Sequence, residues 1–294
     1  MNITLVGIGL FALLACAWSS TAQAAVPVDS GYVQVDGGKL YYEMAGQGEC
    51  IVLIHDGLIH HEVWDNQFYV FAERYRVVRY DRRGYGKSPD PEAPYSLIDD
   101  LDALFTQLKI EKARVFGMSA GGRLAIDFTL AHPEKVSGLV LVGAVVSGYG
   151  VTQHLMTRGG RVPSLEKLMA DPQALIHYFG WEDPYQICPE NVEARKTSLR
   201  LLQTHPQNVS NRKFELMKPV DRPAVQHLAE IKVPTLVIVG EFDMPDVHAH
   251  AGVIEVGIPN AQREIISKAG HLVPLEQPEA LNQIVFDFFE KVGL

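Results

Sequence analysis

The chain has 294 residues, of which 47% are apolar and 21% are Asp, Glu, Lys or Arg. This composition excludes intrinsic disorder, collagen-like repeats and a membrane protein with several spans. The chain carries 26 Lys and Arg against 35 Asp and Glu, which gives a formal net charge of -9 and argues against a nucleic acid as partner. The length suits one large α/β domain with an insertion, or two small domains.

Residues 1 to 24 have the features of an export signal. They contain no charged side chain, and their apolar stretch from Ile3 to Trp18 is shorter than the roughly 20 residues that span a bilayer. Ala22-Gln23-Ala24 then offers a site for signal peptidase, so we expect a periplasmic or secreted protein whose mature body has no stable membrane insertion. Because no Lys or Arg precedes the apolar stretch, an uncleaved membrane anchor stays open as an alternative, as does lipidation of Cys16.

Strands and helices alternate along the rest of the chain. Tyr32–Val35 and Leu40–Met44 flank Asp36-Gly37-Gly38 and predict a hairpin. Short β-branched runs and longer periodic apolar stretches then follow one another, which predicts a mostly parallel sheet with helices on both faces. The predicted strands are Ile51–His55, Arg76–Asp81, Ala113–Gly117, Gly138–Val142, Thr235–Gly240 and Glu264–Ser267, and the predicted helices are Val63–Ala72, Leu97–Leu108, Gly122–Ala131 and Ala280–Val292.

The alternation breaks once, between about Ser147 and Glu230, where no strand pattern appears. Apolar residues are scattered there among helix formers, and a helical insertion of this kind needs a surface on which to bury them. The nearest surface is the carboxyl edge of the sheet, so we expect 25–146 and 231–294 to form the core and 147–230 to form a helical lid after the sixth strand. The apolar residues concerned are Leu155, Met156, Leu165, Leu168, Met169, Leu175, Phe179 and Trp181.

Two cysteines, Cys50 and Cys188, remain after the leader is removed. In an exported protein, the two thiols could be oxidised to a disulfide. The predicted topology puts Cys50 at the start of a core strand and Cys188 in the insertion beyond the opposite strand ends, which is too far apart for a bridge. We therefore expect two unpaired thiols.

Gly117-Met118-Ser119-Ala120-Gly121 follows a predicted strand and precedes a helix, as a G-x-S-x-G nucleophile elbow requires. A strained turn lifts the serine hydroxyl above the sheet, and small neighbours allow close approach of the backbone. The alternative interpretation is a glycine-rich turn with an incidental serine.

An active serine needs a base and an acid, and both follow later strands. His271 comes four residues after the predicted strand Glu264–Ser267, and Glu241 and Asp243 come directly after Thr235–Gly240. Carboxylates two residues apart on an extended segment point in opposite directions, so one of these two orients the histidine, and we favour Asp243. We expect Asp246, beside Pro245, to cap a helix instead.

Five ordered motifs make the chain resemble the α/β-hydrolase superfamily along nearly its whole mature length outside the insertion. Besides the elbow, they are Leu53-Ile54-His55-Asp56-Gly57 with Trp64, Tyr80-Asp81-Arg82-Arg83-Gly84-Tyr85-Gly86-Lys87-Ser88, Val239-Gly240-Glu241-Phe242-Asp243, and Gly270-His271 followed by Glu276-Gln277-Pro278-Glu279. The resemblance implies that Ser119 is the nucleophile, His271 the base and Asp243 the acid. It also implies an oxyanion hole made by the backbone N–H groups of Gly57 and Ala120. The neighbouring residues Leu58, Met118 and Leu272 are candidates for substrate contact.

This constellation implies an exported serine hydrolase that cleaves a small-molecule ester or lactone of apolar character and needs no cofactor. Carbon–carbon bond hydrolysis, acyl transfer and haloperoxidase-like oxidation with peroxide are alternatives on the same scaffold, because the fold does not select the chemistry. An alternative of another class is a small-molecule-binding module with little turnover.

Three other features of the sequence concern an aspartate, a possible metal site and a basic segment. Asp56 stands where the family usually has glycine, and its side chain either bonds a loop backbone or pairs with His60 or His61. Asp246, His248 and His250 do not predict a metal site, because residues two apart on a helix diverge by about 200°. The basic residues around the second core strand predict structural ion pairs; they are Arg74, Arg76, Arg79, Arg82, Arg83 and Lys87.

Overall fold

The computed structural model describes residues 26–153, 155, 171–183, 188–209 and 212–294. The predicted export signal, with Cys16, lies outside these residues. So do four of the apolar residues of the insertion, which are Met156, Leu165, Leu168 and Met169.

Eight strands form one sheet in the order β1-β2-β4-β3-β5-β6-β7-β8. The strands β1 and β2 form the expected antiparallel hairpin, β2 pairs antiparallel with β4, and all other neighbours are parallel. The predicted α/β fold is confirmed. The strands are β1 Val28–Val35, β2 Gly38–Ala45, β3 Cys50–Ile54, β4 Arg76–Tyr80, β5 Ala113–Met118, β6 Val136–Val142, β7 Thr235–Gly240 and β8 Gln262–Ile266.

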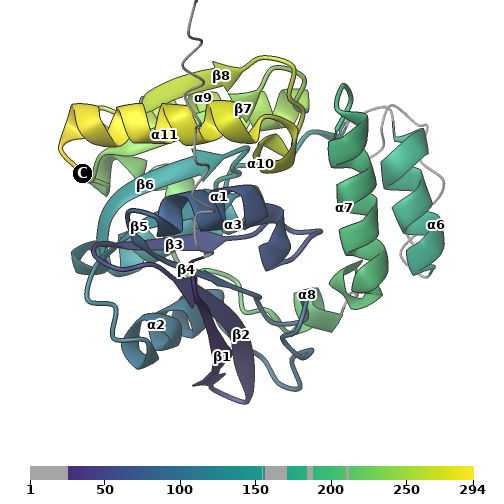
Figure 1. The fold of residues 1–294 in the computed structure, drawn as a ribbon, viewed down its shortest axis with the longest axis horizontal. Helices are drawn as coiled ribbons and strands as arrows, with labels where there is room; N and C mark the ends of the chain where they lie inside the picture. The colour runs from purple at the N-terminus through teal and green to yellow at the C-terminus, as the bar shows by residue number, and fades with distance from the viewer. Residues whose placement is uncertain (1–25, 154, 156–170, 184–187, 210–211) are drawn as a thin grey trace, which may run out of the picture.

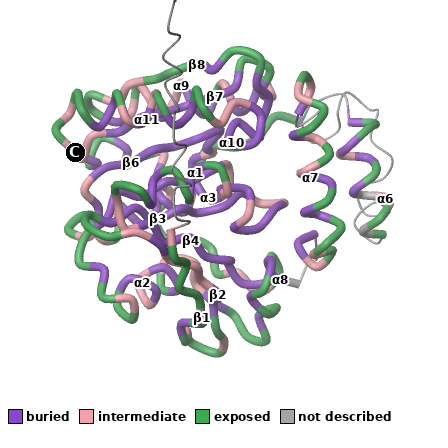
Figure 2. Tube along the Cα trace, viewed as in Figure 1, coloured by how far each residue is buried: buried purple, intermediate pink, exposed green. Residues whose placement is uncertain are grey.

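Helices cover both faces of the sheet (Figure 1). Successive side chains of a strand point to opposite faces, so Ile51 and Leu53 of β3 join one hydrophobic cluster and Val52 and Ile54 join the other. The first cluster packs under α1 (Asp65–Ala72), α10 (Val273–Glu276) and α11 (Pro278–Val292). The second packs under α2 (Leu97–Gln107), α3 (Ala120–Ala131) and α9 (Pro245–Gly257). The inner strands are accordingly buried along their length (Figure 2).

Several predicted boundaries differ by one or two residues from those observed. The strand β3 ends at Ile54, because the ring nitrogen of His55 accepts the N–H of Arg82 at 3.0 Å and the chain turns into a loop. The helix α3 begins at Ala120, two residues before its predicted start, because Gly121 and the preceding Ala120 already have helical geometry.

The described part of the insertion between β6 and β7 is mostly helical. Its elements are α6 (Pro172–His177), a π-helical turn (Tyr178–Glu182), α7 (Val192–Thr204), α8 (Arg212–Leu216) and three short 3-10 turns (Pro206–Val209, Ala224–Gln226, Leu228–Glu230). Figure 1 shows α6 and α7 side by side beyond one end of the sheet. Asn191 caps α7 by accepting the N–H of Ala194 at 3.0 Å, and its side-chain amide donates to the carbonyl of Glu276 at 3.0 Å. This contact ties the insertion to the end of α10.

Both cysteines in the described part of the chain, Cys50 and Cys188, are unpaired and buried, as the topology predicted. Burial raises the pKa of the Cys50 thiol to about 11, so this thiol stays protonated at neutral pH.

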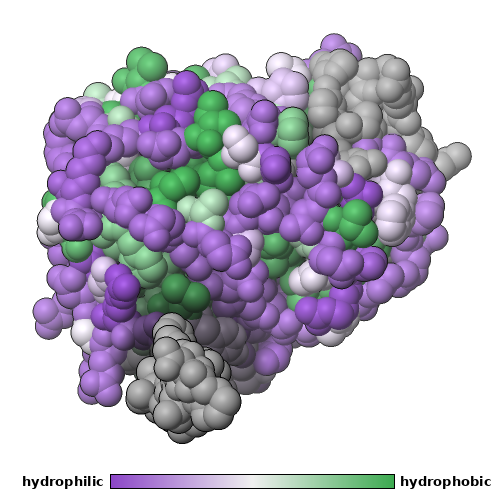
Figure 3. All heavy atoms as spheres, turned by 45° about the horizontal axis from the view of Figure 1, so that its top comes forward, coloured by the Kyte–Doolittle hydropathy of each residue, from purple (hydrophilic) through white to green (hydrophobic). Residues whose placement is uncertain are grey.

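Polar side chains cover most of the face drawn in Figure 3, with apolar ones showing between them in smaller groups. Within the described residues, no helix combines the length and the hydropathy needed to cross a membrane.

The basic residues around β4 have unequal partners. Arg79 pairs with Glu43 at 2.7 Å and Asp65 at 2.5 Å, and Arg83 pairs with Asp100, so the predicted structural ion pairs are confirmed there. Lys87 lies 3.6 Å from Glu43. The prediction is wrong for Arg74, Arg76 and Arg82, because among the described residues no carboxylate lies within 4 Å of their guanidinium groups. Arg74 lies over the Phe286 ring, Arg76 donates to the carbonyl of Leu108, and Arg82 contacts a backbone carbonyl and an aromatic ring.

We expect Arg83→Met to lower the free energy of unfolding by about 3–5 kcal/mol, because it leaves the buried carboxylate of Asp100 without its two-pronged partner. The two bonds measure 2.7 Å and 2.8 Å, and Arg83 and Asp100 are 3% and 4% exposed. Urea unfolding measures the change. The control Lys196→Met breaks an exposed pair with Glu193 and should change stability by less than about 1 kcal/mol. Equal effects of the two substitutions would contradict the prediction.

Candidate active site

The turn after β5 holds Ser119 in a strained conformation. Its φ of 52° and ψ of -116° lie in a region that side chains other than glycine rarely occupy. The turn is possible because Gly117 has no side chain: a Cβ there would lie 2.6 Å from the Cα of Gly122. The backbone N–H of Ser119 donates to the carbonyl of Val142 at 2.9 Å, which fixes the turn against the end of β6. The serine is therefore held at the edge of the sheet, half-buried and ahead of α3.

His271 and Asp243 meet at the same edge. The Nδ1 atom of His271 lies 2.9 Å and 3.1 Å from the two carboxylate oxygens of Asp243. Gly143, at φ 53° after β6, faces this pair, since a Cβ there would lie 3.2 Å from the imidazole and 3.1 Å from the carboxylate. Val142 bonds Ser119 and is followed by Gly143, so one corner of the chain holds all three residues together.

The environment of His271 favours a protonated imidazole. Burial acts against the charged form, but the Asp243 carboxylate outweighs it through its charge and its hydrogen bond, so the pKa of His271 lies above its ordinary value of 6.5. Such a histidine can take a proton from a neighbouring hydroxyl and keep it while an intermediate forms.

The other two acidic residues after β7 have different partners. Glu241 is exposed and accepts the backbone N–H of Lys268 at 3.0 Å. The prediction that Asp246 caps a helix is wrong: Met244 is the N-cap of α9, and Asp246 sits in the first turn. The Asp246 carboxylate instead accepts the N–H of Thr152 and, at 2.9 Å, the hydroxyl of that residue. Because proline occupies the first helical position, the cap lies two residues earlier than the sequence suggested.

The peptide between Asp56 and Gly57 has a fixed orientation beside the start of α3. Its carbonyl lies 2.8 Å from Nδ1 of His55 and also accepts the Arg82 guanidinium, so its N–H, on Gly57, points the opposite way. A Cβ on Gly57 would lie 3.5 Å from the Cβ of Ala120, which makes these residues neighbours. Ala120 is the first residue of α3, so its N–H has no acceptor within the helix. The geometry thus places two backbone donors together near Ser119.

His55 serves this arrangement as a neutral ring. Burial, with a further contribution from the charge of Arg82, holds the pKa of His55 well below 6.5. A neutral ring can donate from Nδ1 to the Asp56 carbonyl and accept the Arg82 N–H at Nε2.

The Asp56 carboxylate bonds its own loop. Its Oδ1 accepts the N–H groups of Leu58 at 2.5 Å and Ile59 at 2.9 Å, which confirms the simpler of the two predictions. The alternative, a pair with His60 or His61, is wrong: His61 lies 2.7 Å from Asp81, and the Nδ1 of His60 lies 3.1 Å from the Asn208 amide. Burial raises the pKa of Asp56, and its Oδ2 is buried without a hydrogen-bond partner. The loop geometry, not an ion pair, accounts for an aspartate at this position.

Glu276 is a buried acid next to the loop that carries His271. In the sequence it stands out only as part of the motif that follows that histidine. One oxygen accepts the N–H of Gly270 at 2.8 Å, and the other is buried without a partner. Burial raises the pKa of Glu276 to about 8, against the opposing effect of the Gly270 bond. Its position five residues after His271, in an apolar stretch, was the only sequence signal for it. Glu276 therefore sits, largely protonated at neutral pH, beneath the loop that carries the histidine.

No group of histidine, cysteine and acidic side chains in the described residues has the arrangement of a metal site.

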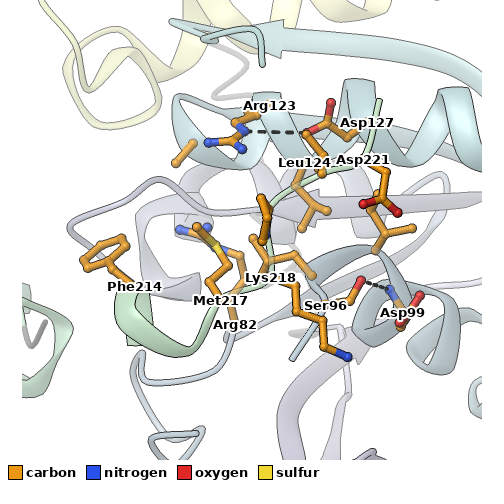
Figure 4. Close-up of a pocket in the computed structure, with 15 residues that line it drawn as sticks. Arg82, Ser96, Asp99, Arg123, Leu124, Asp127, Phe214, Met217, Lys218 and Asp221 are labelled. Atoms are coloured by element: carbon orange, nitrogen blue, oxygen red, sulfur yellow. Dashed lines mark hydrogen bonds and ion pairs between the residues drawn. The ribbon is translucent and has the colours of Figure 1, made fainter. Parts of the chain in front are cut away.

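A cleft of about 560 Å³ opens beside Ala120 (Figure 4). The α3 residues Ala120, Arg123, Leu124 and Asp127 line it, a spacing that places them on one face of the helix. The first turn of α2 and residues 214–221 of the insertion line the other sides. Leu58, Met118 and Leu272 do not line this cleft; Met118 and Leu272 are buried and Leu58 packs on the same core cluster, so their contact with substrate stays a prediction.

Residues 50–278 match the family model of the alpha/beta hydrolase fold. A 2-hydroxy-6-oxononadienedioate/2-hydroxy-6-oxononatrienedioate hydrolase of Paraburkholderia phymatum is 32% identical over 88% of this chain and 95% of its own. A putative 2-succinyl-6-hydroxy-2,4-cyclohexadiene-1-carboxylate synthase of Bacillus subtilis is 29% identical over 85% of this chain and 95% of its own. Among solved structures, Est816, an N-acyl homoserine lactone degrading enzyme, is 26% identical with a TM-score of 0.71 and covers 88% of this chain and 100% of its own.

We expect Glu276→Gln to change how stability depends on pH. The folded protein keeps the proton of Glu276 up to about pH 8, whereas the unfolded chain loses it near 4.5, so wild-type stability falls as pH rises through this window. Each pKa unit of difference corresponds to about 1.4 kcal/mol. Urea unfolding between pH 5 and 8 should show that decline in the wild type and in the exposed-site control Glu279→Gln, and a flatter profile in Glu276→Gln. Parallel profiles in all three proteins would refute the assignment.

Proposed function

The chain belongs to the α/β-hydrolase family, and we propose that it is a serine hydrolase that cleaves a carboxylic ester or lactone through an acyl-enzyme. The observation that carries the proposal is the 2.9 Å contact between His271 and Asp243, held by Gly143 beside the strained turn of Ser119. The lactone-degrading activity of Est816, at 26% identity, supports the choice of bond.

The proposed reaction begins with attack of the Ser119 hydroxyl on the substrate carbonyl. The Nε2 atom of His271 takes the hydroxyl proton, and Asp243 stabilises the imidazolium through Nδ1. The N–H groups of Gly57 and Ala120 donate to the oxyanion, a contribution of about a hundredfold to a thousandfold per donor in related chemistry. His271 then protonates the leaving alcohol, activates a water molecule against the acyl-enzyme, and returns the proton to Ser119.

In this proposal the insertion acts as a lid on the substrate site. Phe214 and Met217 of the insertion line the cleft that opens beside Ala120, and the backbone of Tyr95 pairs with that of Met217. The insertion would thereby select among substrates while the three acting side chains stay on the core.

A second candidate is hydrolysis of a carbon–carbon bond. The relative of Paraburkholderia phymatum, at 32% identity, is a 2-hydroxy-6-oxononadienedioate hydrolase, and the same nucleophile, base and oxyanion donors can attack a ketone. The leaving group is then carbon, so the site must also deliver a proton to a carbon atom. Loss of dienolate absorbance in a 2-hydroxy-6-oxo-dienoate, compared with ester turnover at equal enzyme concentration, ranks the two candidates.

We expect Ser119→Ala to abolish turnover of a panel of 4-nitrophenyl esters and lactones, because no other group supplies the nucleophile. The control Ser137→Ala, a partly exposed serine at the start of β6, should keep wild-type rates. A fluorophosphonate should label the wild type once, and mass spectrometry should place the adduct on Ser119. An adduct on another serine would remove the nucleophile assignment, and tight binding without turnover would instead indicate a binding module.

We expect Asp243→Asn to lower kcat on the order of 10⁴-fold, because an amide favours the wrong imidazole tautomer. Glu241→Gln should stay near wild type, since Glu241 contacts only the N–H of Lys268. The kcat/KM of the wild type should rise with pH through the raised pKa of His271, above 6.5, because only the neutral imidazole accepts the proton. That limb should move to lower pH in Asp243→Asn. A larger loss in Glu241→Gln would transfer the acid role to Glu241.

A further inference from the structure

The Arg82 side chain is a buried cation with no carboxylate within 4 Å among the described residues, although its charge interacts with that of Asp56 and helps to lower the pKa of that carboxyl against the effect of burial. It is 5% exposed, its Nε atom is buried and has no hydrogen-bond partner, and one terminal nitrogen donates to the Asp56 carbonyl. The guanidinium stacks on the Tyr85 ring at 4.7 Å. Buried charges in proteins are normally paired, because removal of a charge from water costs several kcal/mol. An anion from outside the described chain would satisfy Arg82.

Arg82 lies between the cleft and the loop of Gly57. It lines the cleft that begins at Ala120, next to Ser119, although neither Ser119 nor His271 lines the cleft itself, and it holds the peptide whose N–H belongs to Gly57. The guanidinium is thus close to the proposed oxyanion donors and borders the cleft. Its neighbour in sequence, Arg83, already has an anionic partner, because it donates two hydrogen bonds to the Asp100 carboxylate.

Arg123 supplies a second cation at the same end of the cleft. It stands three residues after Ala120 on α3, about 4.5 Å further along the helix axis, and its side chain is 39% exposed. Its pairing with Asp127 is loose, at 3.6 Å, and the hydroxyl of Ser147 also donates to Asp127 at 2.6 Å. If Arg123 turns toward an incoming anion, Ser147 still donates to Oδ1 of Asp127, and Oδ2 loses only the 3.6 Å contact.

The remaining carboxylates of the cleft lie away from these two arginines. Figure 4 shows Arg82 and Arg123 on one side and Asp99 and Asp221 on the other. The cleft is also lined by Asp127, which pairs with Arg123, and by a third cation, Lys218. Asp99 and Asp221 are thus the lining carboxylates that lie away from the two arginines.

We propose that Arg82 and Arg123 bind a carboxylate group of the substrate, so that the preferred ester or lactone carries an anionic group close to its scissile bond. This inference rests on the proposed ester chemistry of Ser119 and names the substrate class for it. The planar guanidinium fork suits a carboxylate, which can accept two parallel N–H bonds.

Two matched pairs of esters test the proposal on either side of the scissile bond. The acyl-side pair is 4-nitrophenyl hydrogen adipate and its neutral methyl ester, and the alcohol-side pair is 4-acetoxybenzoate and its methyl ester. In one pair, the wild-type kcat/KM should be about 10- to 100-fold higher for the anionic member, the range expected of a charged hydrogen bond. A ratio near one, or a preference for the neutral member, in both pairs would overturn the proposal.

Variants assign that ratio to the two arginines. Arg82→Met and Arg123→Gln should each bring the ratio of anionic to neutral substrate toward one, whatever happens to the absolute rate, and Arg82→Lys should retain part of it. Arg263 lies on β8 and pairs with Glu255 of α9, so the control Arg263→Gln should keep the wild-type ratio. If Arg82→Met does not fold, as judged by circular dichroism, Arg123→Gln and the wild-type ratios decide. A ratio that is unchanged in a folded Arg82→Met would overturn the proposal.

A binding measurement separates this proposal from the proposed function. Calorimetry on Ser119→Ala should detect adipate or benzoate and not adipamide or benzamide, with affinity weakened about tenfold or more by Arg123→Gln. Arginine-dependent binding without ester turnover in the wild type would contradict the ester chemistry and support the carboxylate site. Ester turnover without any preference for the anions would do the reverse.

Discussion

The parallel direction of β3, β5, β6, β7 and β8 is the constraint on which the site depends. Parallel neighbours bring their carboxyl ends to one edge of the sheet. Residues that follow different strands therefore become neighbours there although they are far apart in sequence. Ser119 after β5, Asp243 after β7 and His271 after β8 all lie at this edge. Gly143, after β6, completes it by leaving room for the imidazole.

A second layer of polar groups supports the loops beyond that edge. The loop after β3 and the loop after β4 hold each other through a neutral His55 and through Arg82, which bond the same Asp56 carbonyl. The direction of the Gly57 N–H is thereby determined by groups on the far side of its peptide. Not every buried polar atom of the described residues has a partner, and Nε of Arg82 and Oδ2 of Asp56 are two such atoms in these loops.

The sequence predicted the features that rest on local chemistry. Strand patterns, the glycine spacing of the elbow and the order of Ser119, Asp243 and His271 each depend on few residues. The structure brings Asp243 and His271 into contact at the edge of the sheet where the turn of Ser119 lies. Features that depend on packing were missed or wrong. The partners of His61 and the cap of α9 depend on residues such as Asp81 and Met244 whose position only the folded chain defines. The unpaired state of Arg82 could not be predicted either, since five other basic residues near it in sequence suggested a set of equivalent ion pairs.

The place of the insertion has a consequence for how the chain folds during synthesis. The residues of the first six strands are synthesised before residues 147–230, and those of β7 and β8 are synthesised afterwards. Until β7 arrives, β6 is an edge strand, and its sequence from Val136 to Val142 is almost entirely apolar. Unpaired apolar edges of this kind invite pairing between chains. The emerging protein therefore presents an aggregation-prone surface for the time needed to synthesise the insertion, and a chain that ends within the insertion would retain that surface permanently.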